Sequence, residues 1–339
     1  MSEVNELNNG LMENTSVKEE KKLMPDLLSV SASPHIKGHE TTRTIMLDVV
    51  IALLPACIWG VHAFGWRALA IMLISVASSV VFELAFELIT KRPVTIGDLS
   101  AVVTGLLLAL NISVSVPLWL PVVGSLFAIV IVKQVFGGIG KNIVNPALAA
   151  RVFMFAWPAE MGSFVEPLQA DAVASATPLT SLKTGVIPDV KLADMFFGNV
   201  SGCIGEVSAL LLISGGIYLL IRRVISWHIP VAYIGTVALL TFIFPKAGSG
   251  SEFMLYELLS GGLMIGAIFM ATDYVTSPMT KAGKLIYGAG CGIITVFIRY
   301  FGNYPEGVSF SILIMNLLVW YIDKATWPKK FGGKNNAGK

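Results

Sequence analysis

Residues 44–64 read TIMLDVVIALLPACIWGVHAF, and residues 68–90 read ALAIMLISVASSVVFELAFELIT. Each stretch is apolar over about 20 residues, the length that a helix needs to cross the roughly 30 Å hydrocarbon core of a bilayer. Only residues 65–67 separate the two stretches. They therefore predict two membrane-spanning helices joined by a short turn.

The same pattern recurs along the rest of the chain. Of its 339 residues, 55% are hydrophobic and 14% are charged, whereas soluble domains carry about 25% charged residues. We therefore expect an all-α, polytopic membrane protein with about ten transmembrane helices. The fifth span is short and lies between Pro146 and Pro158, so we expect a tilted or broken helix there. The eight further predicted spans are 98–115, 118–133, 147–158, 202–221, 229–245, 258–272, 285–300 and 308–323.

The positions of the basic residues predict how these spans are oriented. Lys and Arg are more frequent on the cytoplasmic side of membrane proteins. If the N-terminus is cytoplasmic, 18 of the 24 Lys and Arg residues fall in cytoplasmic segments and 5 fall in segments on the other side. We therefore expect both termini in the cytoplasm.

The long polar break 159–201 separates two groups of five spans. An odd number of spans in each half gives the halves opposite orientations, as in the inverted repeats of many transporter folds. Weak sequence echoes between the halves fit this arrangement, although ordinary helix ends rich in Pro and Gly explain them equally well. The expected segments are a polar cytoplasmic tail (1–43), a first membrane half (44–158), an extracytoplasmic loop (159–201), a second membrane half (202–323) and a basic cytoplasmic tail (324–339).

The outer loop contains the stretch LQADAVASATPLTSLKTG at residues 168–185. By composition alone, its small and hydroxyl-bearing residues are typical of a flexible connector. A loop of 43 residues is nevertheless longer than most connections in compact proteins, and long loops often carry function.

Within that loop, DAVASATPL at residues 171–179 resembles the flavin-attachment motif Asp-x-x-Ser/Thr-x-Ala-Thr. The motif is found in a family that joins the D subunit of the Rnf complex and the B subunit of the sodium-pumping NADH:quinone reductase. In that family a separate flavin transferase esterifies the last Thr to the phosphate of FMN. The resemblance implies a covalent FMN on Thr177, with Asp171 as the motif acid. The implied flavin-site residues are Asp171, Ser175, Ala176, Thr177 and Pro178.

One position departs from the motif. Ala174 stands where the motif has Ser or Thr, and Ser175 follows one place later. The departure bears on the efficiency of flavin attachment more than on family membership. A threonine hydroxyl is a poor nucleophile unless a base activates it, so we interpret Thr177 as a tether that the transferase modifies. We expect no catalytic residue in this chain.

Three further blocks are similar to the same family and occur in the same order. Residues 136–147 read FGGIGKNIVNPA, residues 269–278 read FMATDYVTSP and residues 303–310 read NYPEGVSF. The resemblance covers residues 40–325, and the length of the chain favours the Rnf side of the family. It implies a subunit of an ion-translocating oxidoreductase in the bacterial inner membrane, in which electrons pass through FMN between ferredoxin and NAD and drive Na⁺ or H⁺ transport.

The resemblance also implies partners and a second site. The expected partners are the other membrane and peripheral subunits of the complex, including a second flavinylated subunit, together with the flavin transferase and membrane lipid. Polar breaks of this family are implicated in holding riboflavin or in the ion path. The candidates for that second site are Asn142, Asn145, Arg151, Thr272 and Asp273.

Several of these polar residues fit ordinary structural roles equally well. Asp273 also fits a solvated helix end, and Arg151 also fits a phosphate ligand, a partner of a buried acid or a side chain that reaches the interface. Glu83 and Glu87 lie one helical turn apart. We expect them to pair with basic residues 91–92 at the cytoplasmic surface, with a cation relay as the alternative.

Other classes of site lack support in the sequence. Cys57, Cys203 and Cys291 are far apart and form no CxxC pair, so we expect small buried apolar residues and no metal site. A net charge of +2 indicates no nucleic-acid partner. Two rival functions remain open, namely the B subunit of the quinone reductase and a solute channel or secondary transporter with inverted repeats and no flavin.

Overall fold

The computed structural model describes residues 41–167, 177–206, 208–302 and 306–328. The helical body begins at Thr42, and its described residues contain α-, 3₁₀- and π-helices but no β-strand. The expectation of an all-α fold is therefore confirmed for the described residues. Asp171, Ser175 and Ala176 lie outside the described residues.

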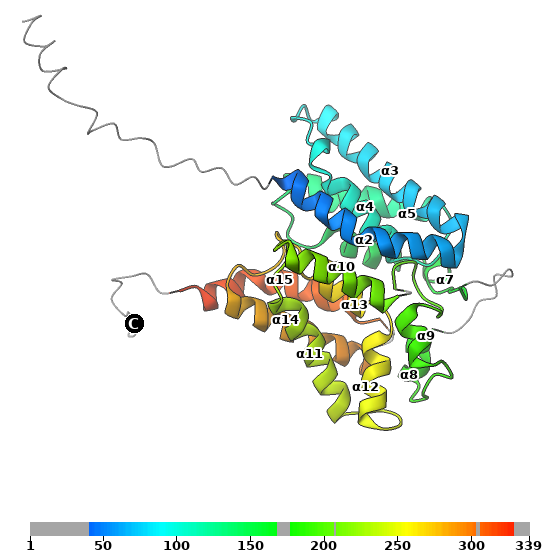
Figure 1. Ribbon diagram of the computed structural model, residues 1–339. Coiled ribbons are helices and arrows are strands. Elements are labelled where there is room, and N and C mark those ends of the chain that lie inside the picture. Colours follow the sequence, from blue (N-terminus) through cyan, green and yellow to red (C-terminus); the bar gives the residue numbers. More distant parts are fainter. Residues whose placement is uncertain (1–40, 168–176, 207, 303–305, 329–339) are drawn as a thin grey trace, which may run out of the picture. The chain divides into compact units, whose positions relative to one another are not determined.

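The first part of the body contains long helices followed by shorter ones (Figure 1). The elements are α2 (Thr42–Phe64), α3 (Trp66–Ile89), η1 (Ile96–Asp98), α4 (Ser100–Leu110), α5 (Trp119–Leu126), the π-helix η2 (Phe127–Gln134) and α6 (Pro146–Met154).

Short helices follow in the segment that connects the two parts. They are α7 (Pro158–Met161), α8 (Pro178–Lys183) and α9 (Leu192–Phe197).

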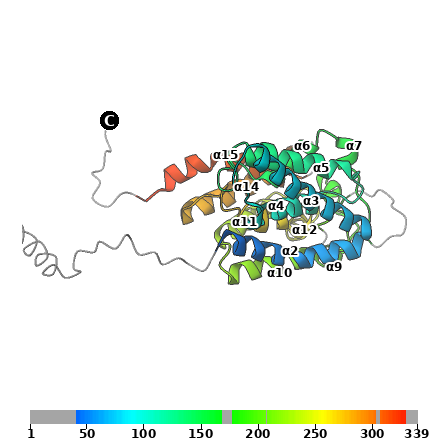
Figure 2. The same cartoon turned by 90° about the horizontal axis from the view of Figure 1, so that it is seen from above.

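The second part resembles the first in its mixture of long and interrupted helices. Its elements are α10 (Ala209–Ile221), α11 (His228–Ile243), α12 (Gly250–Leu259), α13 (Leu263–Ile265), the π-helix η3 (Gly266–Met270), α14 (Lys281–Phe301) and α15 (Val308–Thr326). Seen from above, α10 lies alongside α2, where the two parts meet (Figure 2).

Four helices among the described residues are long and apolar enough to cross a membrane, namely α2, α3, α14 and α15. A fifth span is formed if α12 and α13–η3 count as one helix bent by 68°. Other predicted spans correspond to shorter apolar helices, such as α4, α10 and α11.

Two predicted spans are wrong in their limits, and one contact explains both errors. The span expected at 98–115 ends at Leu110, and the span expected at 202–221 begins at Ala209. The backbone N–H groups of Ile204 and Gly205 donate to carbonyl oxygens of Ile112 and Leu110, at 3.0 and 2.8 Å. Carbonyls at a helix end need such partners, above all away from water. The segment before α10 therefore caps the end of α4 and is not part of a span.

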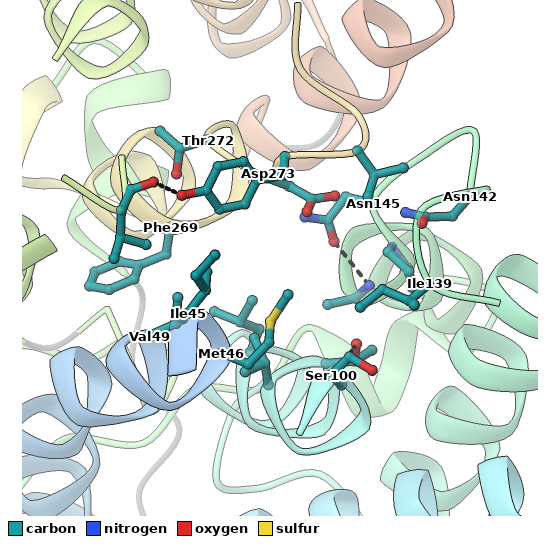
Figure 3. Close-up of a pocket in the computed structure, with 18 of the residues that line it drawn as sticks. Ile45, Met46, Val49, Ser100, Ile139, Asn142, Asn145, Phe269, Thr272 and Asp273 are labelled. Atoms are coloured by element: carbon teal, nitrogen blue, oxygen red, sulfur yellow. Dashed lines mark hydrogen bonds between the residues drawn. The ribbon is translucent and has the colours of Figure 1, made fainter. Parts of the chain in front are cut away.

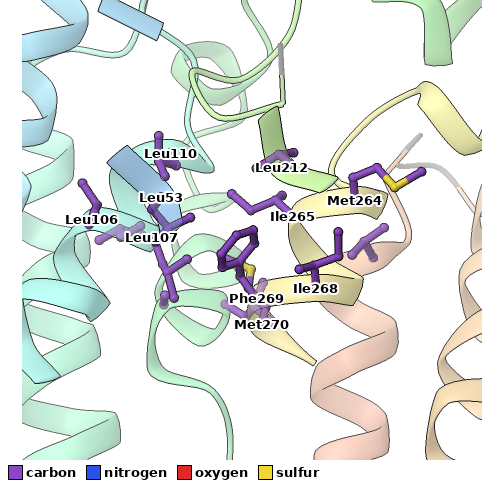
Figure 4. Close-up of a cluster of buried hydrophobic side chains, with 14 of the residues drawn as sticks. Leu53, Leu106, Leu107, Leu110, Leu212, Met264, Ile265, Ile268, Phe269 and Met270 are labelled. Atoms are coloured by element: carbon purple, nitrogen blue, oxygen red, sulfur yellow. The ribbon is translucent and has the colours of Figure 1, made fainter. Parts of the chain in front are cut away.

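α4 lies at the centre of the packing. Ten of its eleven residues are buried. Its leucines meet side chains from α2, α10 and the α13–η3 helix in one apolar cluster, in which Leu53, Leu107, Ile265 and Phe269 point toward one another (Figure 4). The two ends of this central helix lie at the two sites described next.

Candidate functional sites

Thr177 is the N-cap residue of α8, and Pro178 is the first residue of that helix. Proline is favoured there because it lacks the N–H that the first turn cannot pair and because its φ is fixed near the helical value. The Thr177 hydroxyl lies 2.9 Å from that of Thr180 and accepts no hydrogen bond from the backbone of α8. The hydroxyl is thus not committed to capping the helix.

A cavity of about 360 Å³, counting its open mouth, lies beside Thr177. Its wall includes apolar residues of α8, α9 and α12, and two carboxylates, Glu206 and Glu306. Neither glutamate is among the residues predicted from the sequence. Glu206 is the one charged residue in the apolar stretch 202–221, and a lone ionisable group in such a stretch is a signal that could have identified it.

Arg151 of α6 lies behind this cavity, and its side chain is 3% exposed. Its Nη2 is 3.4 Å from Glu206 Oε1 and also pairs with Glu306. Its Nη1 donates to Asn111 Oδ1 at 3.0 Å, at the end of α4. Of the roles left open by the sequence, the structure shows pairing with buried acids. The Cys203 sulfur completes this arrangement, 3.4 Å from Arg151 Nη2.

A second buried arginine lies at the break between α12 and α13. Arg299 Nη1 is 2.6 Å from Glu257 Oε2, and Arg299 Nη2 donates to the Ser260 carbonyl at 3.0 Å. Gly261, with φ +64°, forms the break, and a Cβ added there would lie 3.5 Å from Arg299 Nη2. The guanidinium therefore pairs with a carbonyl that the broken helix leaves without an intrahelical partner.

Cys203 and the two glutamates beside Arg151 place one sulfur and two carboxylate oxygens within 4.8 Å of one another. The Arg151 guanidinium already supplies a positive charge to both carboxylates. The group is therefore an ion-pair cluster.

A larger pocket, of about 800 Å³ counting its mouth, lies at the other end of α4 (Figure 3). Asn142, Asn145, Thr272 and Asp273 line it. Four of the five candidates for the second site thus come together, whereas Arg151 lies elsewhere. Apolar side chains of α2 and η3 complete the wall, among them Ile45, Met46, Val49 and Phe269.

Asn145 fixes the geometry of this pocket. Its Oδ1 accepts from the backbone N–H groups of Ala147 and Leu148, at 3.0 and 3.3 Å, so it caps α6. Its Nδ2 donates to the Met270 carbonyl at 3.2 Å, at the end of η3. A single side chain therefore ties the start of α6 to the segment that carries Asp273.

Glu83 and Glu87 lie on a buried polar face of α3, which corrects the expectation that they pair with residues 91–92. Glu83 Oε1 is 2.6 Å from Lys133 Nζ, and Glu87 Oε2 accepts from the Thr95 backbone at 3.1 Å. The reason is that η2 packs against α3 and brings Lys133 to Glu83. Cys57, Cys203 and Cys291 are buried, as expected, and none of them forms a disulfide.

Comparison with known proteins places the chain in a family. The family model described as "NQR2, RnfD, RnfE family" matches residues 29–332. The D subunit of the Na⁺-translocating ferredoxin:NAD⁺ oxidoreductase complex of Acetobacterium woodii is 48% identical over 90% of this chain and 95% of its own length.

Two further relatives carry related names. The D subunit of the proton-translocating ferredoxin:NAD⁺ oxidoreductase complex of Clostridium ljungdahlii is 41% identical over 92% of this chain and 98% of its own length. The D subunit of the ion-translocating oxidoreductase complex of Stutzerimonas stutzeri is 39% identical over 87% of this chain and 93% of its own length. On the extent of these matches, the chain belongs to the NQR2, RnfD, RnfE family.

Proposed function

We propose that this chain is the membrane-embedded D subunit of an Rnf-type complex, an ion-translocating ferredoxin:NAD oxidoreductase, and that it carries electrons through FMN esterified to Thr177. The observation that carries the proposal is the 48% identity to a protein of that name over 90% of the chain. The Thr177 hydroxyl does not cap α8 and lies beside a cavity, which supports the flavin part of the proposal.

The residues around Thr177 fit a covalently held flavin. Pro178 and the first turn of α8 hold the backbone of the attachment residue, and the adjoining cavity offers an apolar wall with two carboxylates. When bound, the flavin supplies one- and two-electron chemistry that no side chain here can perform. The chain's own part is to hold and orient the flavin and to set the local charge.

We propose that the second pocket holds a non-covalent flavin, riboflavin. Its wall is mostly apolar and carries a few polar groups, as is typical of small-molecule pockets. Asn142, Asn145 and Asp273 are the polar groups that would orient the ring, and an ion path through the same residues is the alternative. Because α4 has 11 residues, about 16 Å of helix separates the two sites.

We propose ten crossings in two inverted halves, with the segments expected from the sequence except that the sixth crossing begins at Ala209. Both termini and the second pocket would face the cytoplasm, and the Thr177 loop would face outward across the bacterial inner membrane. The helix pairing supports this arrangement, because α2 packs on α10, α6 packs on α15, and the α3–α5 pair has its counterpart in α11–α14. The other subunits, one of them flavinylated, the flavin transferase and membrane lipid are the proposed partners.

Covalent flavin is tested by expressing the chain in membranes with its flavin transferase and viewing a denaturing gel under ultraviolet light. Wild type and Thr180→Ala should fluoresce, and Thr177→Ala should be dark. Thr180 is the matched control because it carries the same hydroxyl, 2.9 Å away. A dark wild-type band, beside a control flavoprotein that is modified in the same cells, would remove the flavin from the proposal.

The electron acceptor and the coupling ion need a separate measurement on the purified complex. Ferredoxin-dependent NAD reduction supports the Rnf assignment, and NADH-dependent quinone reduction supports the rival that the family description also covers. The names of the Acetobacterium and Clostridium relatives differ in the ion, Na⁺ in one and protons in the other. A Na⁺ titration of ferredoxin:NAD activity at fixed pH distinguishes these two cases.

A further inference from the structure

Five ionisable side chains gather at the α12–α13 break, near the proposed flavin. All lie on different elements or connections and all are largely buried. They are two arginines, Arg151 and Arg299, and three glutamates, Glu206, Glu257 and Glu306.

Glycines allow these groups to approach one another. A Cβ added to Gly262 would lie 2.7 Å from Glu206 Oε1 and 3.5 Å from Arg151 Nη1. A Cβ added to Gly261 would meet the second arginine at 3.5 Å and Glu306 Cγ at 3.9 Å. The ion pairs of the two arginines therefore adjoin one another across the break.

The charges of this cluster do not balance. Two guanidinium groups face three carboxyl groups, so the fully ionised cluster carries one excess negative charge. An unpaired charge removed from water is costly, and a carboxyl group in that situation is stabilised in its protonated form. Among the described residues, no Lys, Arg or His lines the cavity beside Thr177.

Among the three carboxyl groups, Glu206 makes the longest contact with an arginine. Glu257 makes a 2.6 Å ion pair with Arg299, and Glu306 makes the closer of the two contacts to Arg151. Glu206 lies 3.4 Å from Arg151, and its side chain is 4% exposed, against 13% for Glu306.

The groups that face Glu206 come from several elements. Arg151 approaches from α6, Glu306 from the connection before α15, and Cys203 from the segment of Glu206 itself. Burial, and after it the charge of Glu306, raise the pKa of Glu206 to about 7, whereas Arg151 opposes this rise. Glu206 lies in the connection before α10, outside the helices that span the membrane.

An additional feature of the cluster is an unpaired donor. Arg151 is 2% exposed, and its Nε–H has no hydrogen-bond partner among the described residues. Buried N–H groups are nearly always paired with protein or with ordered water. The guanidinium that holds Glu206 therefore keeps one buried donor that the described residues leave unpaired.

We propose that Glu206 is a proton-binding site whose occupancy follows the charge of the flavin on Thr177. The inference rests on the proposed function, because it requires the flavin on Thr177. Glu206 and Thr177 line one cavity. Added negative charge on the flavin favours the neutral carboxyl, and its removal favours the carboxylate. Arg151 acts as a positioning residue that holds Glu206 beside that cavity.

The balance of the step is simple. An electron reaches the flavin from the preceding carrier of the complex, which is ultimately reduced by ferredoxin. A hydronium ion of the surrounding solvent loses a proton, which forms an O–H bond with a Glu206 carboxylate oxygen, and leaves a neutral water molecule. When the electron leaves for the next carrier, the proton returns to water. Glu206 is neither oxidised nor reduced.

The test is a redox titration of the covalent flavin in the purified complex, between pH 6 and pH 9. Above about pH 7 Glu206 is ionised while the flavin is oxidised, so reduction should draw one extra proton there. One proton adds up to about 59 mV per pH unit to a one-electron step and about 30 mV to a two-electron step. Above pH 7, we expect the slope of the flavin's midpoint potential against pH to be steeper in wild type than in Glu206→Gln, by up to that amount. Below pH 7, we expect the two slopes to be equal.

Controls separate this inference from the proposed function. Glu252→Gln, an exposed change on α12, should keep the wild-type slope. A dark gel before the titration would refute the flavin, whereas a fluorescent gel with equal slopes in wild type and Glu206→Gln would refute only the proton site. A potential that depends on Na⁺ but shows no difference in pH slope would also refute it.

Two further measurements cover a Glu206→Gln variant that does not accumulate. Glu206→Asp should keep the pH range in which the midpoint potential depends steeply on pH. Glu306→Gln should shift that range to lower pH, because it removes the carboxylate that repels the Glu206 carboxylate. Reduced-minus-oxidised infrared spectra at pH 8 should show a protonated carboxyl band in wild type that Glu306→Gln weakens. An unchanged curve and an unchanged spectrum in Glu306→Gln would overturn the proposal.

Discussion

Replacing Lys133 by Met should destabilise the protein more than any other single change of a basic residue to Met on η2 or the adjoining loop. The Lys133 ammonium lies 2.6 Å from Glu83 Oε1, and the two side chains are 4% and 0% exposed. It also donates to Ser100 Oγ at 2.6 Å. The second carboxylate oxygen of Glu83 has no partner among the described residues. Loss of the ammonium would therefore leave a buried carboxylate that only Gln134, at 2.8 Å, still contacts.

Breaking one side of a buried ion pair costs about 3–5 kcal/mol, because the remaining charge stays buried without compensation. We expect Lys133→Met to lower the free energy of unfolding by that amount. Adding Glu83→Gln should restore most of it, since the double variant has no uncompensated charge. The coupling between the two sites is then obtained from a double-mutant cycle.

The assay is equilibrium unfolding in detergent micelles, followed by tryptophan fluorescence. Lys281→Met is the matched control, because Lys281 is exposed at the start of α14, and we expect a change within about 0.5 kcal/mol. The reasoning is refuted if Lys133→Met unfolds like the control, or if the double variant is no more stable than Lys133→Met alone.

Further predictions concern packing, capping and thiol burial. Gly105→Ala should lower the free energy of unfolding by about 1–3 kcal/mol, because the added Cβ would lie 2.7 Å from a backbone oxygen of α3. A Cβ added to Gly235 would meet nothing within 4 Å, so Gly235→Ala should be neutral or stabilising in the same unfolding assay. Asn145→Ala should lower stability by about 1 kcal/mol through loss of the α6 cap and should weaken riboflavin binding in equilibrium dialysis; unchanged binding would argue against a flavin in that pocket. Cys203 and Cys291 are buried, so maleimide should label them in denaturant but not in intact membranes; rapid labelling of native membranes would contradict the packing.

The class of fold can be predicted from the sequence, because long apolar stretches in a chain with so little charge are compatible with few structures other than membrane helices. Asn142 and Asp273 can also be assigned to one site, although 131 positions separate them. That assignment depends on family resemblance, since no periodicity connects two loops that lie so far apart. The helix limits at Leu110 and Ala209 cannot be predicted in this way, because they depend on backbone hydrogen bonds between distant segments.

The partners of Arg151 in the charged cluster also cannot be predicted from the sequence. An arginine inside an apolar stretch is costly, which draws attention to Arg151 but does not identify its partners. Glu206 and Glu306 are 100 positions apart, and only the tertiary packing brings both to one guanidinium. Likewise, the sequence favours nearby basic residues as partners of Glu83, and the packing of η2 on α3 supplies a more distant one.

The nine-residue length of α6 has a consequence for how the protein is made. Nine residues form about 14 Å of helix, roughly half the thickness of the hydrocarbon core, and arginine at the centre of a span adds about 2.5–3.5 kcal/mol to the cost of insertion. The translocation machinery therefore has no reason to release α6 into lipid by itself. Glu306 and Ser309, which contact Arg151, are synthesised 155 and 158 residues after it. We therefore expect α6 to reach its final position only after these residues have been synthesised, and we expect a nascent chain truncated before Glu306 to be more sensitive to protease in membranes.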